Sequence, residues 1–449
     1  MTIEQDQAAG LPATQGMALL RGKIQNVVVL MLENRSFDHL LGDLPGVEGI
    51  KPGLSNPDFR KSGDSLVMVP VRKATSPAMP YDPNHEFTDV KLQLSLDHEA
   101  GGMADPMGGF ITSAQQISGA NPEDAYRVME YFTQDQLPAL SALAREFAVC
   151  TSWHSSLPGP TFPNRFFVHA ATSGGLTLSP PEVSIIEGFS FSGGTVYSKL
   201  SDAKRTWRIY HDGLPQTASI NDLRAEYINP FTENFRQMEL FQADVQAGKL
   251  PDYTFIEPDY DVSHDYQGGN SMHPRDDVRK GEGLVKAVYE QLRASSYWGK
   301  VLFLVVFDEH GGFYDHVVPP AATPPGGDEP NANPSGFAFD RYGVRVPAIV
   351  VSAYTKKGTV IAQDASGDPI LFDHASVYRT LADRFDLGYL TDRSQEATSL
   401  SVALNQDAAR LDAASALPTL PAIADLSAFG AAPTVLPADS PRRHSRAGL

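Results

Sequence analysis

Four short apolar runs stand out along the chain, and each is rich in β-branched or aromatic side chains. They cover residues 23–31, 253–256, 301–307 and 346–352. Runs of this length without polar alternation are typical of strands buried on both faces, as in a parallel sheet. Segments with helical periodicity lie between them, notably residues 283–298. Strands that alternate with helices predict an α/β fold, with a mainly parallel sheet sandwiched by helices.

The same pattern divides the chain into three parts. Residues 1–22 predict a flexible leader, residues 23–398 hold the expected strands and helices, and residues 399–449 form an Ala/Pro-rich tail. Within the middle part, loop insertions are expected near residues 51–135 and 180–229, which lack strong periodicity. The tail is expected to pack weakly or to dock on a partner, and it is the segment through which a homo-oligomer would form.

Composition excludes several classes of protein. The formal charge is −18, from 54 acidic and 36 basic side chains, which argues against a nucleic-acid partner because binding of that polyanion needs Lys and Arg. No apolar run reaches the roughly 20 residues that span a bilayer. Cys150 is the single cysteine, so the chain forms no internal disulfide. No cleavable signal peptide is visible, which predicts a cytoplasmic protein or one exported by another route, such as a secreted effector.

Two of the predicted strands are followed directly by acid and amide side chains. Glu33 and Asn34 follow the first run, and Asp308 and Glu309 follow the third. Ligands of open α/β sheets bind beyond the carboxyl ends of the strands, and oxygen donors converging there suit a hard or borderline divalent cation.

A simpler interpretation of each residue exists: Glu33 caps the next helix, and Asp308 opens a turn before two glycines. This simpler interpretation is weaker for the pairs Glu33–Asn34 and Asp308–Glu309 taken together. Two such pairs at the ends of buried strands would bring negative charges close to one another, and a cation would offset them.

Thr161 lies in the segment Ser156-Leu157-Pro158-Gly159-Pro160-Thr161-Phe162-Pro163-Asn164-Arg165, just before an apolar stretch that can be helical. A hydroxyl at a helix N-terminus lies where backbone N–H groups and the helix dipole favour a phosphate. The alternative, that Thr161 is only an N-cap, stays open at this point.

Four blocks in order resemble one known family. ENRSFDH follows the first strand, GPTFPNR precedes a helix, MHP is followed by GE, and FDEHGGFYDH follows a late strand. This series is similar to the signature of the bacterial phospholipase C and acid phosphatase (phosphoesterase) family of the alkaline-phosphatase-like superfamily. The match extends from about residue 27 to residue 386, which makes residues 23–398 the expected catalytic domain.

The resemblance implies a role for each matching residue. The positions that match the family's divalent metal ligands are Glu33, Asn34, Thr161, Asp308 and Glu309. Thr161 also matches its nucleophile. The residues that resemble its active-site histidines are His85, His211 and His273. The metal would be Ca, Mg, Mn or Zn. Outside this set, His310 is expected beside the ligands, and Arg35 and Arg165 are expected to pair with acids.

The implied activity is that of a phospholipase C, which cleaves a phospholipid such as phosphatidylcholine to diacylglycerol and a phosphorylated head group through a phosphothreonine. The alternative within the family is a broad-specificity acid phosphatase acting on phosphomonoesters. Peripheral contact with a membrane is expected of the former. An aromatic cage for a choline cation would draw on Tyr260, Tyr266 and Tyr314.

A non-enzymatic binding or scaffold protein is the alternative of a different class. The G-x-S-x-G and H-E-x-x-H motifs of other hydrolases are missing from the sequence.

Overall fold

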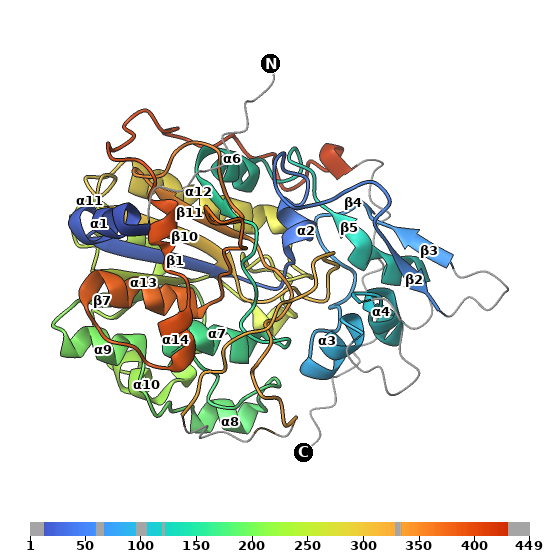
Figure 1. Ribbon diagram of the computed structural model, residues 1–449, viewed down its shortest axis with the longest axis horizontal. Coiled ribbons are helices and arrows are strands. Elements are labelled where there is room, and N and C mark those ends of the chain that lie inside the picture. Colours follow the sequence, from blue (N-terminus) through green and yellow to red (C-terminus); the bar gives the residue numbers. More distant parts are fainter. Residues whose placement is uncertain are drawn as a thin grey trace.

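The structure is a computed structural model that describes residues 13–59, 67–95, 106–118, 122–327, 333 and 335–429. Its core is an eight-stranded sheet with the order β12-β6-β11-β10-β1-β9-β7-β8 (Figure 1). The strands are β1 (Asn26–Leu32), β6 (Ala148–Cys150), β7 (Trp207–His211), β8 (Phe235–Gln237), β9 (Tyr253–Glu257), β10 (Val301–Phe307), β11 (Ala348–Ser352) and β12 (Thr359–Ile361). Five of the seven pairings are parallel, and only the two made by β11 are antiparallel. The predicted mainly parallel α/β fold is confirmed.

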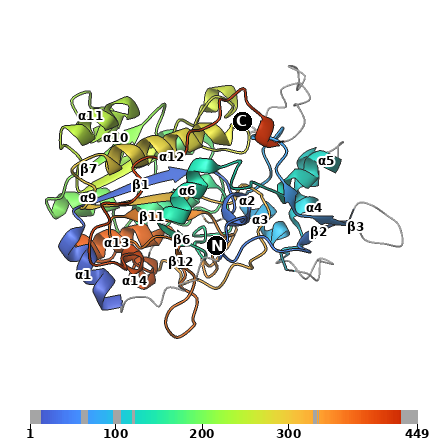
Figure 2. The ribbon, with the colours of Figure 1, turned by 90° about the horizontal axis from the view of Figure 1, so that it is seen from above.

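The two central strands, β1 and β10, are buried along their whole length, as their apolar sequences predict. Helices cover both faces of the sheet. Figure 2 shows α12 (Val278–Arg293) on one side of β1, and α1 (Ala13–Lys23) and α13 (Ala375–Phe385) on the other. Helix α6 (Pro138–Glu146) packs on α12, and α7 (Thr161–Ala170) packs on α13. None of the described helices is both long and apolar enough to cross a membrane.

Both ends of the described chain pack on this core, contrary to the expected flexible leader and weakly packed tail. Leu19 and Leu20 of α1 are buried, because α1 lies on α13 and on the 3₁₀ helix η6 (Leu400–Ala403). Farther along, Arg410 forms an ion pair with Glu146 that is nearly inaccessible to solvent. Residues 1–12 and 430–449 lie outside the described part.

The two predicted insertions differ in kind. The described parts of residues 51–135 lie together at the right of Figure 1 and form most of a small second hydrophobic core, which includes Val90, Phe110 and Val128 and is completed by Tyr314. Residues 180–229 hold the core strand β7 and are therefore not only a loop insertion. The short run Trp207–His211 was not recognised because Arg208 interrupts its apolar pattern.

The remaining elements are short. Those of residues 51–135 are β2 (Ser55–Asp58), β3 (Val67–Pro70), β4 (Arg72–Lys73), α3 (Phe87–Gln93), α4 (Phe110–Ser118), α5 (Pro122–Ala125), η2 (Tyr126–Met129) and β5 (Glu130–Tyr131). The others are α2 (Phe37–Leu41), α8 (Glu182–Glu187), α9 (Val196–Asp202), η3 (Gln216–Ser219), α10 (Asn221–Tyr227), η4 (Met238–Leu240), α11 (Phe241–Gln246), η5 (Val262–His264), α14 (Asp392–Glu396) and η7 (Ser427–Phe429).

Candidate active site

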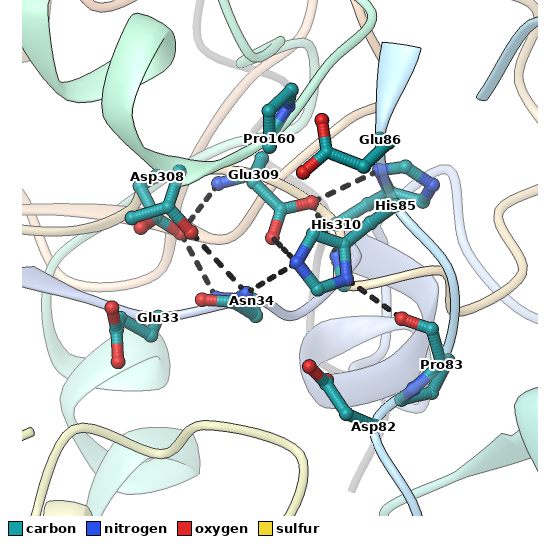
Figure 3. A network of polar contacts seen from close by, with 12 residues as sticks. Glu33, Asn34, Asp82, Pro83, His85, Glu86, Pro160, Asp308, Glu309 and His310 are labelled. Carbon is teal, nitrogen blue, oxygen red and sulfur yellow. Dashed lines mark hydrogen bonds and ion pairs between the residues drawn. The ribbon is translucent and has the colours of Figure 1, made fainter. Parts of the chain in front are cut away.

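The carboxyl ends of β1 and β10 bring together the four oxygen-bearing residues noted in the sequence. Leu32 pairs with Phe307 in parallel register, so the residues that follow each strand emerge side by side. The backbone N–H of Asn34 donates to Asp308 Oδ1 at 2.9 Å, and the N–H of Arg35 donates to the Glu309 carbonyl at 2.9 Å. Figure 3 shows Asn34, Asp308 and Glu309 facing one another.

Backbone geometry allows this close approach. Asn34 has a left-handed backbone, with φ of 58°, which asparagine tolerates better than most residues. Gly311 follows the DEH segment with φ of 62°, and a Cβ there would lie 2.1 Å from the Asn34 carbonyl oxygen. Its N–H donates to Glu309 Oε2 at 2.7 Å. Glycine at this position therefore lets the two strand-end segments touch and fixes the Glu309 carboxylate.

The Asn34 side chain links this pair of strand ends to Thr161. Asn34 Nδ2 lies 3.4 Å from Thr161 Oγ1 and 3.4 Å from His85 Nε2. Thr161 is the first residue of α7, and Pro160 occupies the N-cap position without a side-chain cap. The interpretation of Thr161 as an N-cap is therefore wrong. Ser36 caps α2, so Glu33 is not a helix cap either.

The loop before Thr161 leaves the carboxyl end of β6 and is held by one side chain of α7. Asn164 Oδ1 accepts the Leu157 N–H at 3.1 Å, and Asn164 Nδ2 donates to the Gly159 and Pro160 carbonyls at 2.9 and 3.0 Å. Residues 153–160 are all buried, whereas Thr161 is half-buried. The hydroxyl of Thr161 is thus accessible on a rigid support.

Arg165, one turn after Thr161, supplies the positive charge in the centre of the site. Its Nε donates to Asp308 Oδ2 at 2.9 Å, and its NH2 lies 4.0 Å from Glu33 Oε1. Burial raises the pKa of Asp308 while Arg165 opposes the shift, and burial raises the pKa of Glu33 to about 7 against the same guanidinium. The expectation that Arg165 pairs with acids is confirmed.

His85 and His273 approach the site from either side of Asp82. His85 Nε2 lies 3.9 Å from Glu309 Oε1, and its Nδ1 is 2.7 Å from the Pro83 carbonyl. Burial disfavours the charged ring, but Glu309 and Asp82 outweigh it and raise the pKa of His85 to about 10. His273 Nε2 lies 3.5 Å from Asp82 Oδ1. Sequence reasoning missed Asp82, whose signal is its position three residues before His85.

Among the described residues, no hydrogen bond, ion pair or ring contact joins His211 to this cluster. It ends β7, its Nδ1 lies 2.8 Å from the Gly213 carbonyl, and its ring packs on Tyr227 and Phe235. It lines a separate pocket of about 360 Å³. The structure thus brings two of the three expected histidines to this cluster, while His211, at the carboxyl end of β7, lies beside a separate pocket.

The three tyrosines considered for a choline cage do not share one surface. Tyr260 donates to Glu257 at 2.8 Å and accepts from Arg165 at 2.8 Å, and Tyr314 packs edge-on against Phe110 in the small core. At the site, the Tyr260 ring is covered by Arg165, and the Tyr266 ring stacks on His273 with the centroids 3.9 Å apart.

The donor set fits a divalent cation. Among the described residues, Glu33 Oε2, Asn34 Oδ1 and Glu309 Oε1 are buried oxygens with no hydrogen-bond partner. Buried oxygens of this kind are costly unless something satisfies them. Together with Asp308 they place three carboxylates around a single guanidinium, an excess of negative charge that a hard cation would neutralise.

A second acidic cluster, formed by Asp38, Asp315 and His316, has a different character. His316 Nδ1 lies 2.6 Å from Asp38 Oδ2, while Arg345 reaches Asp315 at 2.9 Å and Asp38 at 3.1 Å. The Arg345 guanidinium is 1% exposed and already compensates both carboxylates. This cluster is therefore a buried ion-pair network that ties together the segments after β1 and β10.

The sequence of the chain matches the model of the phosphoesterase family over residues 24–388. The chain belongs to the phosphoesterase family. A relative named non-specific phospholipase C3, from Arabidopsis thaliana, is 37% identical over 417 residues, which cover 90% of this chain and 77% of that protein. A non-hemolytic phospholipase C from Burkholderia pseudomallei is 27% identical and covers 85% of this chain and 58% of its own length. The resemblance drawn from the motifs is confirmed, and the chain is an enzyme, a phosphoric ester hydrolase.

Among solved structures, a protein in the alkaline phosphatase superfamily from Vibrio parahaemolyticus is similar. The TM-score is 0.39 at 11% sequence identity, and the alignment covers 88% of this chain and 81% of that one.

Proposed function

We propose that this phosphoesterase is a metal-dependent phospholipase C that cleaves a phospholipid to diacylglycerol and a phosphorylated head group, with Thr161 as its nucleophile. The observation that supports the assignment most directly is the position of the Thr161 hydroxyl. It lies at the N-terminus of α7, within 3.4 Å of the Asn34 amide and next to buried oxygens that lack partners. The similarity to proteins named phospholipase C supports the choice of a phosphodiester.

Glu33, Asn34, Asp308, Glu309 and the Thr161 hydroxyl would hold the cation. When bound, it would neutralise charge on the phosphate and lower the pKa of the Thr161 hydroxyl, which is otherwise a weak nucleophile. The identity of the ion, among Ca, Mg, Mn and Zn, is a matter for experiment.

The side chains would then divide the chemistry between them. Thr161 gives up its hydroxyl proton to solvent as its Oγ attacks phosphorus in line with the leaving oxygen. The new Oγ–P bond forms as the bond to the diacylglycerol oxygen breaks, the leaving oxygen takes up a proton, and the phosphoryl group on Thr161 still carries the head group. His85, beside the Asn34 amide, is assigned to the non-bridging oxygens, and His273, beside Asp82, to the leaving oxygen. Water then cleaves the phosphothreonine and releases the phosphorylated head group. The free N–H groups at the start of α7 favour the phosphate throughout.

Thr161→Ala tests the nucleophile. Turnover should fall by several orders of magnitude, since loss of a nucleophile costs on the order of 10⁶ in comparable covalent systems. Thr161→Ser should retain measurable activity because the hydroxyl remains. An acid quench with substrate labelled in its head group should trap the phosphorylated head group on Thr161.

The matched control is Thr195→Ala, since Thr195 caps α9 by accepting the Ser198 N–H at 3.2 Å. Its loss should lower stability by about 1 kcal/mol and leave turnover intact. Near-normal turnover by folded Thr161→Ala would remove the nucleophile assignment.

Chelation tests the cation, and it should abolish activity and lower the melting temperature because three carboxylates would then face one another. Restoring each candidate ion in turn identifies the one used. Full activity without detectable metal would contradict the metal-dependent mechanism.

Comparing the turnover of a choline phosphodiester with that of a phosphomonoester decides between phospholipase C and acid phosphatase.

A further inference from the structure

Large apolar side chains that are mostly exposed are concentrated in one part of the described chain. Seven such side chains are more than half exposed, and six of them lie between residues 183 and 262. These six are Val183 (58%), Ile186 (65%), Leu214 (72%), Ile228 (72%), Phe231 (89%) and Val262 (64%), and they are named here the apolar rim. The seventh, Leu411, lies elsewhere and is 75% exposed.

The segments that carry the apolar rim adjoin one another. Arg224 of α10 donates to the Ile186 and Ile185 carbonyls of α8 at 2.6 and 3.0 Å. Leu214 lies two residues before η3, which packs against both α8 and α10. The loop after β9 lies against the same turn, because a Cβ on Gly213 would be 3.2 Å from Asp259 Oδ1. Figure 1 shows α8 and α10 along the lower edge of the molecule.

Hydrogen bonds connect these segments to the active site from two directions. The Ser179 N–H, just before α8, donates at 3.1 Å to Glu86, the neighbour of His85. At the other end, Glu257 accepts the N–H groups of Gln216 and Thr217 at 2.7 and 3.1 Å. Glu257 also accepts the Tyr260 hydroxyl, which in turn binds Arg165 beside Asp308. The apolar rim therefore belongs to loops that also support the catalytic residues.

The charges in these segments indicate which surface the apolar rim fits. Residues 179–189, 211–216, 228–233 and 261–265 contain six acids and no Lys or Arg. Arginines outside these ranges pair with two of the acids, Glu233 with Arg236 and Asp265 with Arg275, so four acids give these loops most of their charge. Acidic loops repel an anionic bilayer, whereas the ammonium group of a zwitterionic head group complements them. A soluble protein gains nothing from exposing such side chains, but they release free energy when they enter the interface of a bilayer.

We propose that the apolar rim inserts into the surface of a zwitterionic phospholipid bilayer and holds the active site against its substrate. The inference rests on the proposed phospholipase C function. It extends that function by naming the surface through which a chain of net charge −18 reaches a lipid.

Vesicle sedimentation of the full-length protein tests the proposal. The parent for binding is Thr161→Ala, which keeps the vesicles intact, and the probe is large unilamellar vesicles of phosphatidylcholine. Ile186→Ser/Leu214→Ser/Phe231→Ser should weaken partitioning on the order of a hundredfold, from the apolar area lost. Leu411→Ser is the matched control and should change it by less than about twofold. Binding should persist at high salt and should be weaker on phosphatidylglycerol vesicles.

Turnover separates this inference from the proposed function. For turnover, the triple substitution is made in the protein that keeps Thr161. This variant should lose activity on phosphatidylcholine vesicles and keep the kcat/KM of the unsubstituted enzyme on a short-chain, monomeric phosphatidylcholine. Partitioning equal to that of the parent would overturn the inference, as would tighter, salt-sensitive binding to phosphatidylglycerol. The inference would also be overturned if the parent formed dimers in solution and did not bind vesicles, and if the triple substitution converted those dimers to monomers. Failure of the unsubstituted enzyme to hydrolyse any phospholipid would instead count against the proposed function.

Discussion

Replacing Arg165 with methionine should destabilise the protein by about 3–5 kcal/mol, the typical cost of breaking a buried ion pair from one side. The guanidinium is 1% exposed and compensates Asp308, which is fully buried. It also donates to Tyr260 at 2.8 Å and to the Leu32 carbonyl at 3.3 Å. Methionine fills a similar volume but leaves the Asp308 charge without a partner.

The pH dependence of this loss has a definite sign. Arg165 lowers the pKa of both Asp308 and Glu33 against the effect of burial. Without the guanidinium, both folded-state pKa values rise further above their unfolded values, so the folded state binds more protons than the unfolded state over a wider range. Stability then falls as pH rises through that range, and the deficit of Arg165→Met should grow from acidic to neutral pH.

Urea denaturation in the presence of a chelator measures both effects without a contribution from bound metal. Lys51→Met is the control, because Lys51 and Glu48 form an exposed pair worth about 0–1 kcal/mol. Asp308→Asn in the Arg165→Met background should recover part of the loss, since the uncompensated charge is gone. The reasoning would be refuted if Arg165→Met unfolded within about 1 kcal/mol of the unsubstituted protein.

Three other changes have definite expected outcomes. Burial raises the pKa of Glu282 from 4.5 to about 7, so this group should cost about 3 kcal/mol as pH rises from 4.5 through 7, and Glu282→Gln should flatten urea stability against pH in that interval. Truncation after residue 398 should lower the melting temperature strongly, because it removes Leu400, Leu404 and Leu417 from the main hydrophobic core. Arg410→Met should show a milder loss, because Glu146 then keeps Lys357 as a partner at 2.9 Å. Asp308→Asn should reproduce the loss of turnover caused by chelation more closely than His310→Ala does, since His310 reaches the site only through Glu309 at 3.4 Å.

The sequence predicted the centre of the sheet better than its edges, for a physical reason. β1 and β10 are covered on both faces, so every position except Asn26 is apolar and the two runs are visible without tertiary information. β6 and β12 are three residues long and carry too little pattern to distinguish them from loop. β6 matters for the site nonetheless, because the loop that presents Thr161 leaves from its carboxyl end.

The candidate site shows the same division. Asn34, Asp308 and Glu309 were predictable because they directly follow recognisable strands. Asp82 comes from a segment without periodicity, and its approach to His273 depends on how residues 51–135 fold back over the sheet edge. The role of His211 stays a prediction, since it ends β7 at the same edge of the sheet but lines a pocket of its own.

Strand direction explains how one edge of the sheet collects the chemistry and how that edge is held rigid. β1, β9, β10 and β7 run parallel, so the residues after each strand arrive at the same edge. β11 runs antiparallel to β10, and the segment that precedes it arrives there instead. That segment carries Arg345, which binds Asp38 after β1 and Asp315 after β10. A single reversed strand thus places a cation where it can tie together the two loops that present Asn34 and Glu309, while Arg165 compensates the carboxylates nearest the nucleophile.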